Sequence, residues 1–400
     1  MPKINIYEAD KTGSTYLGDE IVVFLPGKCS IVKTADKNGC VLIPERSNIA
    51  EYLTDAGQDG TYEYAEMLTD RAFQVLYCPV SSVDKALFEQ TWLKDKNEYN
   101  IKYLTTGCSG SVIVTSSNSK STKASGEEQS LSFATDIAVQ MMSLASERKD
   151  CVALIDVGPN SPDMKPTDLQ KALTDIVIPS DDGLKKTYGA SFADWGYIDD
   201  KHETSMPGSY FYLGALGTAV NNGQKWDSVA GVKRGVLSSY AAPVSMNLTK
   251  YELDNVIMPP SETETGSSSF NGIVNVRPYG YTIWGDRTLR NNKGDGLKAT
   301  SFLSIRVLVC DLCKRVYNAA INNTFESNSD VTWMNYKTTI ADLLDQMVAD
   351  YKLADYKIIK LASDRASQIK CQIRLVPLEP VEDFDIYIQL ENATANITEG

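Results

Sequence analysis

Residues 151–157 read Cys-Val-Ala-Leu-Ile-Asp-Val, an almost continuous apolar run with one acidic residue, Asp156. Such a run is typical of a strand that is covered on both faces, as in a parallel sheet. Residues 21–25 form a second run of this kind, and residues 133–146 carry most of an apolar helix face. Because strands alternate here with helical patterns, the sequence predicts an α/β layer in this half of the chain. Further strands are predicted at residues 40–43, 73–77, 101–104 and 111–115, and a helix at residues 85–93.

The last third of the chain has a different pattern. Apolar residues three and four positions apart predict an amphipathic helix over residues 301–321 and a second helix around residues 340–348. Two strand patterns follow at residues 356–361 and 370–375 and predict a β-hairpin. The fold class expected from the sequence is therefore α/β plus α+β, with the α+β domain at the C-terminal end.

Both ends of the chain carry a short alternating pattern, which is typical of a strand with one buried face. Residues 13–18 and 377–380 contain Gly or Pro and predict flexible links beside these strands. The pattern alone leaves open whether each strand pairs within its own chain or with a neighbouring copy. The apolar positions are Ile4 and Ile6 near the start, and Phe384, Ile386, Ile388 and Leu390 near the end.

The composition excludes several function classes. The chain has 400 residues and a formal net charge of −13, with a pI near 4.7. This excess of acidic residues argues against DNA or RNA as the main ligand, because binding to phosphates needs a positively charged surface. The single histidine, His202, excludes metal sites that need two or more His ligands. No apolar run approaches the ~20 residues of a membrane span, so we expect no membrane partner.

The cysteines indicate free thiols. The eight cysteines are scattered, and the first residues lack the pattern of a signal peptide, so we expect a reducing compartment and no disulfide framework. Cys310 and Cys313 form a Cys-x-x-Cys pair inside the predicted helix at 301–321. A pair in mid-helix has poor disulfide geometry, and no second pair completes a metal site. We therefore expect both residues to serve in packing.

Three further positions could carry chemistry. Residues 107–111 follow a strand and contain Ser109, but they lack the Gly-x-Ser-x-Gly spacing of a nucleophile elbow. His202 lies in a charged stretch and is expected in a solvated turn. Asp156 stands at the end of a buried strand, where α/β sheets place functional carboxylates, but no phosphate loop accompanies it. We assign no catalytic, cofactor-binding or metal-binding residue.

The C-terminal region resembles the tail sheath proteins of contractile phage tails, tailocins and injection systems. Residues 280–289, Gly-Tyr-Thr-Ile-Trp-Gly-Asp-Arg-Thr-Leu, are similar to the family's Gly…Trp-Gly-x-Arg-Thr-Leu segment. Residues 325–333 are similar to its Phe-Glu-Pro-Asn-Asp…Trp turn, with Ser327 in place of proline. Residues 377–386 are similar to its Pro-x-x-Pro-x-Glu-x-Phe-x-Ile exit strand. The resemblance covers residues 280–390.

This resemblance implies a non-catalytic subunit that assembles into a contractile sheath. The two terminal strands would complete the sheets of neighbouring subunits. The implied domains are an N-terminal strand arm and linker (1–20), one or two α/β outer domains (21–240), an α+β sheath core domain (241–383) and a C-terminal strand arm (384–400). The residues implied to form the core and intersubunit lattice of the C-terminal domain are Trp284, Gly285, Arg287, Thr288, Phe325, Glu326, Asn328 and Trp333.

The resemblance also implies partners and a location. The partners would be other copies in a helical homopolymer of stacked hexameric rings, a tail tube protein, and baseplate and tail terminator proteins. No nucleic acid, membrane or cofactor is implied. The location would be a virion tail or an equivalent contractile particle, assembled in the bacterial cytoplasm. Two other hypotheses stay open: a soluble α/β hydrolase-like enzyme that uses Ser109 and His202, and another self-assembling shell protein.

Overall fold

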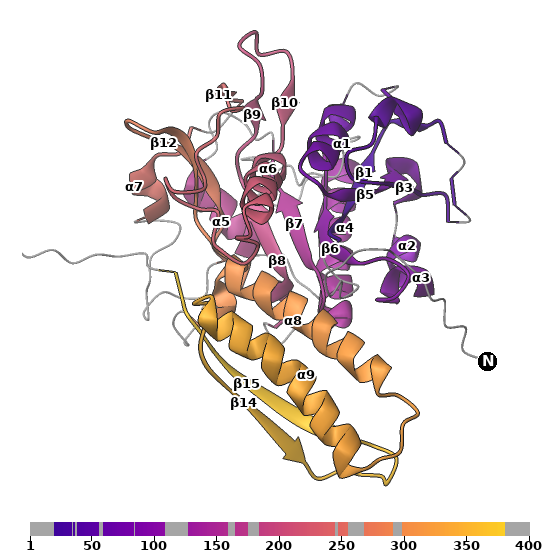
Figure 1. Cartoon of the computed structure of the whole chain (residues 1–400). Coiled ribbons are helices and arrows are strands. Elements are labelled where there is room, and N and C mark those ends of the chain that lie inside the picture. Colours follow the sequence, from indigo (N-terminus) through magenta and orange to yellow (C-terminus); the bar gives the residue numbers. More distant parts are fainter. Residues whose placement is uncertain are drawn as a thin grey trace, which may run out of the picture.

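The structure is a computed structural model (Figure 1). It describes residues 20–33, 35–36, 38–55, 59–83, 85–108, 127–158, 165–174, 184–244, 247–254, 268–290 and 298–380. The two predicted terminal strands and the predicted strand at residues 111–115 lie outside the described residues.

A six-stranded sheet forms the centre of the larger part of the molecule. Its neighbouring strands pair in parallel, except that β3 is antiparallel to β5. The predicted α/β layer and the buried run at residues 151–157 are thereby confirmed. In the order in which they lie across the sheet, the strands are β3 (Val41–Ile43), β5 (Gln74–Pro79), β1 (Val22–Gly27), β6 (Ile101–Thr105), β7 (Val152–Asp156) and β8 (Gly189–Phe192).

Helices cover both faces of this sheet. The helices α1 (Thr61–Asp70) and α6 (Gly208–Asn221) pack against each other on one face. The helix α4 (Glu127–Arg148) lies on the other face with α2 (Lys85–Glu89) and α3 (Thr91–Lys94) (Figure 1). Crossovers between parallel strands are right-handed, so a helix lies on one face when the chain moves one way along the sheet and on the other face when it moves back. Helices on both faces are therefore expected here. Two further helices are the short α5 (Pro166–Thr174) and α7 (Lys250–Glu252).

The predicted single helix at residues 85–93 is two short helices, α2 (Lys85–Glu89) and α3 (Thr91–Lys94). Gln90 separates them with extended backbone angles. After the break, the Trp92 ring lies edge-on against Tyr99, with ring centroids 5.8 Å apart.

The expectation of free cysteines is wrong for one pair. Cys40 and Cys78 form a disulfide whose Cα atoms are 4.6 Å apart. The antiparallel pairing of β3 with β5, which sets Val41 opposite Tyr77, brings the two cysteines together. The other six cysteines are unbonded, and Cys310 is buried as expected for a packing residue.

The C-terminal part is a helical hairpin on a two-stranded sheet (Figure 1). Its elements are α8 (Leu303–Asn322), α9 (Asp330–Ala349), β14 (Leu353–Leu361) and β15 (Lys370–Pro377). The predicted helices and hairpin are confirmed, although α9 begins earlier than its apolar pattern indicated because Ser329 caps it, accepting a hydrogen bond from the Thr332 N–H.

Two hydrophobic clusters meet in α8. Leu303 and Cys310 belong to the cluster of the six-stranded sheet, which also includes Phe270 and Ile283. Leu308 belongs to the second cluster, with residues of α9. The helix α8 therefore contributes to both clusters at once, while the domain boundary expected near residue 240 stays a prediction.

Leu344 in α9 is fully buried in the second cluster. We expect Leu344→Ala to lower the free energy of unfolding of the C-terminal part by about 2–5 kcal/mol, because it leaves a cavity. Val331→Ala in the same helix is the control, since Val331 is 69% exposed. Chemical denaturation followed by circular dichroism measures both. Equal destabilisation by the two variants would contradict this packing.

Candidate assembly site

The first half of the sheath-like motif forms the connection between a β-hairpin and α8. The hairpin consists of β12 (Gly272–Val276) and β13 (Gly280–Trp284). Gly285 follows β13 with φ = +111°, in a region that side chains rarely adopt. The chain turns there, and the next residues run along the beginning of α8.

Asp286 caps α8 from outside the helix. Its Oδ1 accepts a hydrogen bond of 3.1 Å from the Ser304 N–H, and its Oδ2 accepts one from the Ser304 hydroxyl. The residue in the ordinary capping position, Phe302, makes no such bond. A carboxylate at this end also complements the positive end of the helix dipole. Asp286 was not singled out from the sequence, although an Asp upstream of a helix without a capping side chain is a usable signal.

Arg287 and Thr288 are interior residues of this chain, both 1% exposed. The Arg287 guanidinium lies 4.9 Å from the centroid of the Phe302 ring. Its backbone N–H donates to Asn271 Oδ1 at 2.7 Å, and its carbonyl accepts from Asn271 Nδ2 at 2.9 Å. The Thr288 hydroxyl donates to the Thr300 carbonyl at 3.0 Å. Arg287 and Thr288 therefore link the segment after β13 to Asn271 and to the residues just before α8.

Trp284 occupies a half-buried position at the end of β13. Its indole N–H donates to Asp254 Oδ1 at 2.6 Å, and the Lys250 ammonium lies 4.7 Å from the ring centroid. The ring is fixed from one side and partly open on the other.

The second half of the motif lies at the opposite end of α8, about 30 Å away for a helix of 20 residues. Phe325 is 93% exposed and is not a core residue, and Glu326 is exposed as well. Trp333 is buried, with the Lys360 ammonium 5.6 Å from its ring centroid. The Asn328 side chain donates to the Ala366 carbonyl, which joins this turn to the turn of the β14–β15 hairpin.

The β14–β15 hairpin offers two strand edges. Among the described residues no third strand pairs with it, so the outer edges of β14 and β15 are open. One face of the hairpin packs on α9 through partly buried residues such as Ile358, Ile373 and Leu375. An open edge beside a buried face is the geometry that accepts an added strand.

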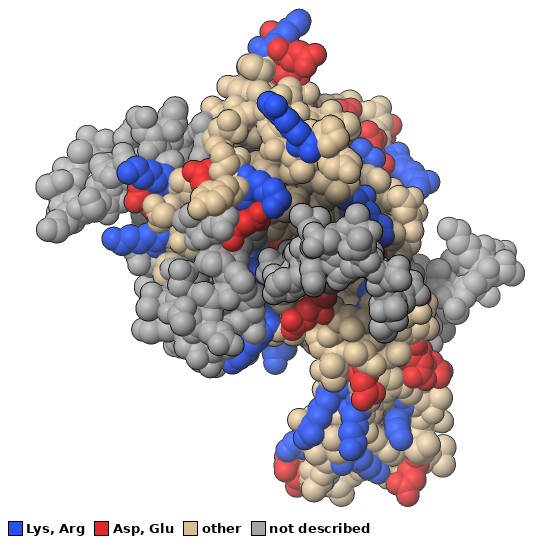
Figure 2. Space-filling view, turned by 90° about the vertical axis from the view of Figure 1, so that its left-hand side faces the viewer, with Lys and Arg blue, Asp and Glu red and all other residues tan. Residues whose placement is uncertain are grey.

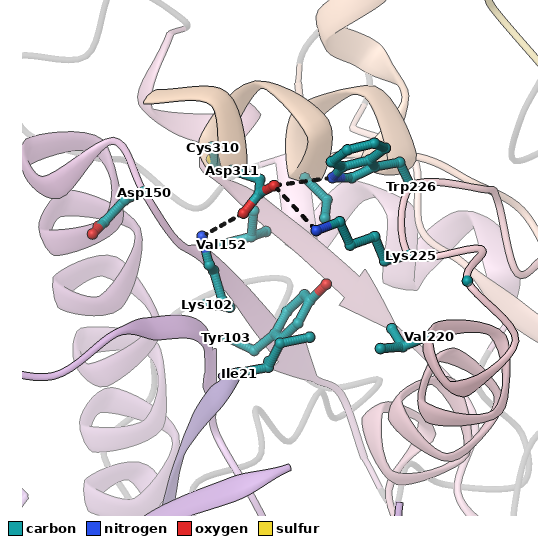
Figure 3. A pocket seen from close by; sticks show the side chains of 12 residues that line it. Ile21, Lys102, Tyr103, Asp150, Val152, Val220, Lys225, Trp226, Cys310 and Asp311 are labelled. Carbon is teal, nitrogen blue, oxygen red and sulfur yellow. Dashed lines mark hydrogen bonds and ion pairs between the residues drawn. The ribbon is translucent and has the colours of Figure 1, made fainter. Parts of the chain in front are cut away.

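A cavity of about 330 Å³ lies between the sheet, α6 and α8 (Figure 3). Asp311 receives a hydrogen bond of 2.8 Å from the Lys102 ammonium, one of 2.9 Å from Arg315 and one of 3.3 Å from the Trp226 indole. Burial opposes the ionisation of Asp311, but the nearby cations outweigh it and hold its pKa well below the ordinary range. The ionised carboxylate ties α8 to β6, which is a structural role.

Asp156, at the end of β7, anchors the start of α6. Its Oδ1 accepts from the Ser209 N–H at 2.8 Å, and its Oδ2 accepts from the Ser209 hydroxyl at 2.6 Å. Tyr64 and Thr106 complete this buried cluster. Burial raises the pKa of Asp156 to about 7. The position favoured by open α/β sheets for function is here occupied by a helix cap.

Of the two residues in the hydrolase hypothesis, the structure describes only His202. His202 is exposed in a turn, and its ring stacks on Tyr197 with centroids 4.7 Å apart. Ser109 lies outside the described residues. In the described part of the chain, no group of three or more His, Cys, Asp or Glu is arranged to hold a metal ion. The described helices include none that is both long and apolar enough to span a membrane.

Proteins similar to this chain are found among solved structures but not by sequence. No protein-family model matches the chain, and no curated protein matches it in sequence. A chain in the structure of the anti-feeding prophage baseplate is 13% identical, with a TM-score of 0.65 over 98% of this chain and 100% of that one. The contracted sheath complex of the extracellular contractile injection system PVC is 14% identical, with a TM-score of 0.64 over 98% of both chains.

The contracted helical sheath of the anti-feeding prophage matches equally well, with 14% identity and a TM-score of 0.64 over 98% of this chain and 99% of that one. The chain has the contractile sheath fold. At this low identity the likeness is one of fold, and it extends over the N-terminal half, where the sequence motifs gave no alignment. The sheath fold therefore includes the six-stranded α/β sheet as well as the C-terminal part.

Asp156 makes stability depend on pH. Its pKa rises from an ordinary 3.8 to about 7 in the folded chain, so between these values the folded chain holds a proton that the unfolded chain has released. The free energy of unfolding should therefore fall as the pH rises from about 4 to about 7, by up to about 1.4 kcal/mol per pH unit.

Asp156→Asn keeps an oxygen that can accept from the Ser209 N–H but cannot ionise. Urea denaturation at several pH values should show a smaller fall for this variant than for the wild type. Superimposable pH profiles would contradict the protonation of Asp156.

Proposed function

We propose that the chain is the subunit of a contractile sheath, a structural protein that polymerises helically around a tail tube and contracts to drive the tube through a target envelope. The observation that carries this proposal is the match of fold over 98% of the chain with sheaths in the contracted state. The proposed role is structural rather than enzymatic.

Strand exchange between subunits is the proposed means of polymerisation. The open edges of β14 and β15 would accept the terminal strands of neighbouring copies, carried by Ile4 and Ile6 or by Phe384, Ile386, Ile388 and Leu390. Main-chain hydrogen bonds would supply affinity, and the alternating side chains would set the register. Because the donated strand and the accepting edge are different surfaces, the contact is heterologous and propagates into a helix.

The exposed motif residues fit contacts in the lattice. Phe325 and Glu326 present their side chains to solvent at the far end of α8, where a neighbouring copy can cover them. Trp284 would contribute its open side near the other end. Arg287, Thr288 and Trp333 would act inside the subunit by keeping these surfaces in place.

Contraction would draw on the contacts between subunits. In this proposal the lattice has an extended and a contracted arrangement, and the strands stay paired while subunits rotate about the links at residues 13–18 and 377–380. The proposed partners are a tail tube, a baseplate and a tail terminator. The proposed location is a virion tail or an equivalent particle assembled in the bacterial cytoplasm.

Removal of residues 384–400 tests the strand exchange. The truncated chain should remain folded, with an unchanged far-ultraviolet spectrum, because the two described hydrophobic clusters are built from earlier residues. It should no longer form particles that sediment at high speed.

A chain that lacks only residues 392–400 is the control, since it keeps the whole alternating pattern. Polymerisation of the 384–400 deletion at the wild-type concentration would refute strand donation by this end.

A further inference from the structure

The face of the β14–β15 hairpin that turns away from α9 is basic. The pairs Ile358–Ile373 and Tyr356–Leu375 lie on the α9 side, where all four residues pack on the second cluster. The intervening cross-strand pairs must therefore lie on the opposite, outward face. Figure 2 shows Lys and Arg side chains side by side over this lower part of the molecule. The outward pairs are Lys357–Arg374, Ile359–Gln372 and Leu361–Lys370.

These cations are poorly neutralised within the described part of the chain. Lys357 and Arg374 lie directly opposite each other, are both exposed, and have no carboxylate within 4.0 Å among the described residues. Lys370 is 3.4 Å from Asp364 in the hairpin turn, and the one acidic residue of the strands on this face is Asp355, near its end. Like charges opposite each other oppose strand pairing. The described residues give Arg374 a hydrogen bond of 3.2 Å to Gln372 Oε1 but bring no carboxylate to either cation, so a carboxylate from outside these residues would stabilise the face.

The last twenty residues of the chain carry the opposite charge. Residues 381–400 contain no Lys or Arg, whereas their acidic residues are Glu382, Asp383, Asp385, Glu391 and Glu399. Asp383, Asp385 and Glu391 occupy the positions between and beside the apolar residues Phe384 to Leu390. If this stretch is extended, its apolar residues face one way and its carboxylates the other.

We propose that the basic outward face of β14 and β15 receives the acidic side of residues 383–391 of another copy, and that this charge match fixes the register of the added strand. The inference rests on the proposed sheath function, and it assigns the charges that would set the register of the exchanged strand. When Phe384 and Ile386 continue the apolar side toward α9, Asp383 and Asp385 lie on the same face as Lys357, Lys370 and Arg374.

The charges make the match specific. A shift by one residue would move the carboxylates to the apolar side and the apolar residues to water, so the register cannot slip by one. The alternating stretch near the start of the chain has Lys3 and Asn5 beside Ile4 and Ile6, and so lacks these carboxylates. The basic face therefore selects the C-terminal segment. Because Lys357, Lys370 and Arg374 are exposed, salt would screen their attraction to the added carboxylates and should weaken the assembly.

Charge reversal tests the inference. The hairpin variant carries Lys357→Glu and Arg374→Glu, and the segment variant carries Asp383→Lys and Asp385→Lys. Each variant alone should need at least about a tenfold higher concentration than the wild type to form sedimenting polymers. An equimolar mixture of the two should restore assembly near the wild-type concentration, because each hairpin then meets a segment of opposite charge.

A matched control reverses two exposed lysines elsewhere, Lys201→Glu and Lys233→Glu, and should assemble like the wild type. Two results would overturn the inference. The first is that the hairpin and segment variants polymerise at the wild-type concentration. The second is that the mixture stays dispersed while one chain with all four substitutions assembles, because the segment would then bind its own chain.

A wild-type chain that never polymerises would contradict the proposed function instead. In that case, carbodiimide cross-linking of mixed ¹⁴N- and ¹⁵N-labelled copies tests the inference separately. It should couple Lys357 or Lys370 of one copy to Asp383, Asp385 or Glu391 of the other. Couplings confined to a single copy, or none between these residues, would overturn it.

Discussion

The arrangement of the described elements depends on the buried side-chain amide of Asn271. Its backbone and side-chain N–H groups both donate to the Ser191 carbonyl of β8, at 2.9 and 3.1 Å, while its side chain also exchanges hydrogen bonds with the backbone of Arg287. One residue further on from Asn271, β12 begins. One residue before Arg287, Asp286 caps α8. A single buried side chain thus fixes the edge of the six-stranded sheet, the β12–β13 hairpin and the start of α8 relative to one another.

This junction explains how the molecule can present distant surfaces in fixed positions. The helix α8 contributes Leu303 to one hydrophobic cluster and Leu308 to the other, so both clusters share one helix. Asp311, on the same helix, adds a network of cations that joins it to β6. The β14–β15 hairpin is thereby connected to the six-stranded sheet through α9 and α8. A lattice that changes shape by moving its subunits as bodies requires this property.

Sequence reasoning could predict the elements whose apolar spacing is strong, namely the buried strands, α8, α9 and the hairpin. It could not predict the Cys40–Cys78 disulfide, because the pairing of β3 with β5 is set by tertiary structure. The motif around Trp284 and Arg287 was visible as a pattern, but its role was not, since the partner Asn271 lies on another strand. Spacing alone also does not show which face of an element packs inward. For this reason the sequence could not predict that Phe325 is exposed or that Lys357 and Arg374 lie opposite each other on the outward face.

Electron microscopy of the purified full-length chain, negatively stained at low salt and at several protein concentrations, tests the central claim most directly. The sheath account predicts hollow tubes with regular transverse striations, whose length increases with protein concentration. Uniform small particles at every concentration would contradict it.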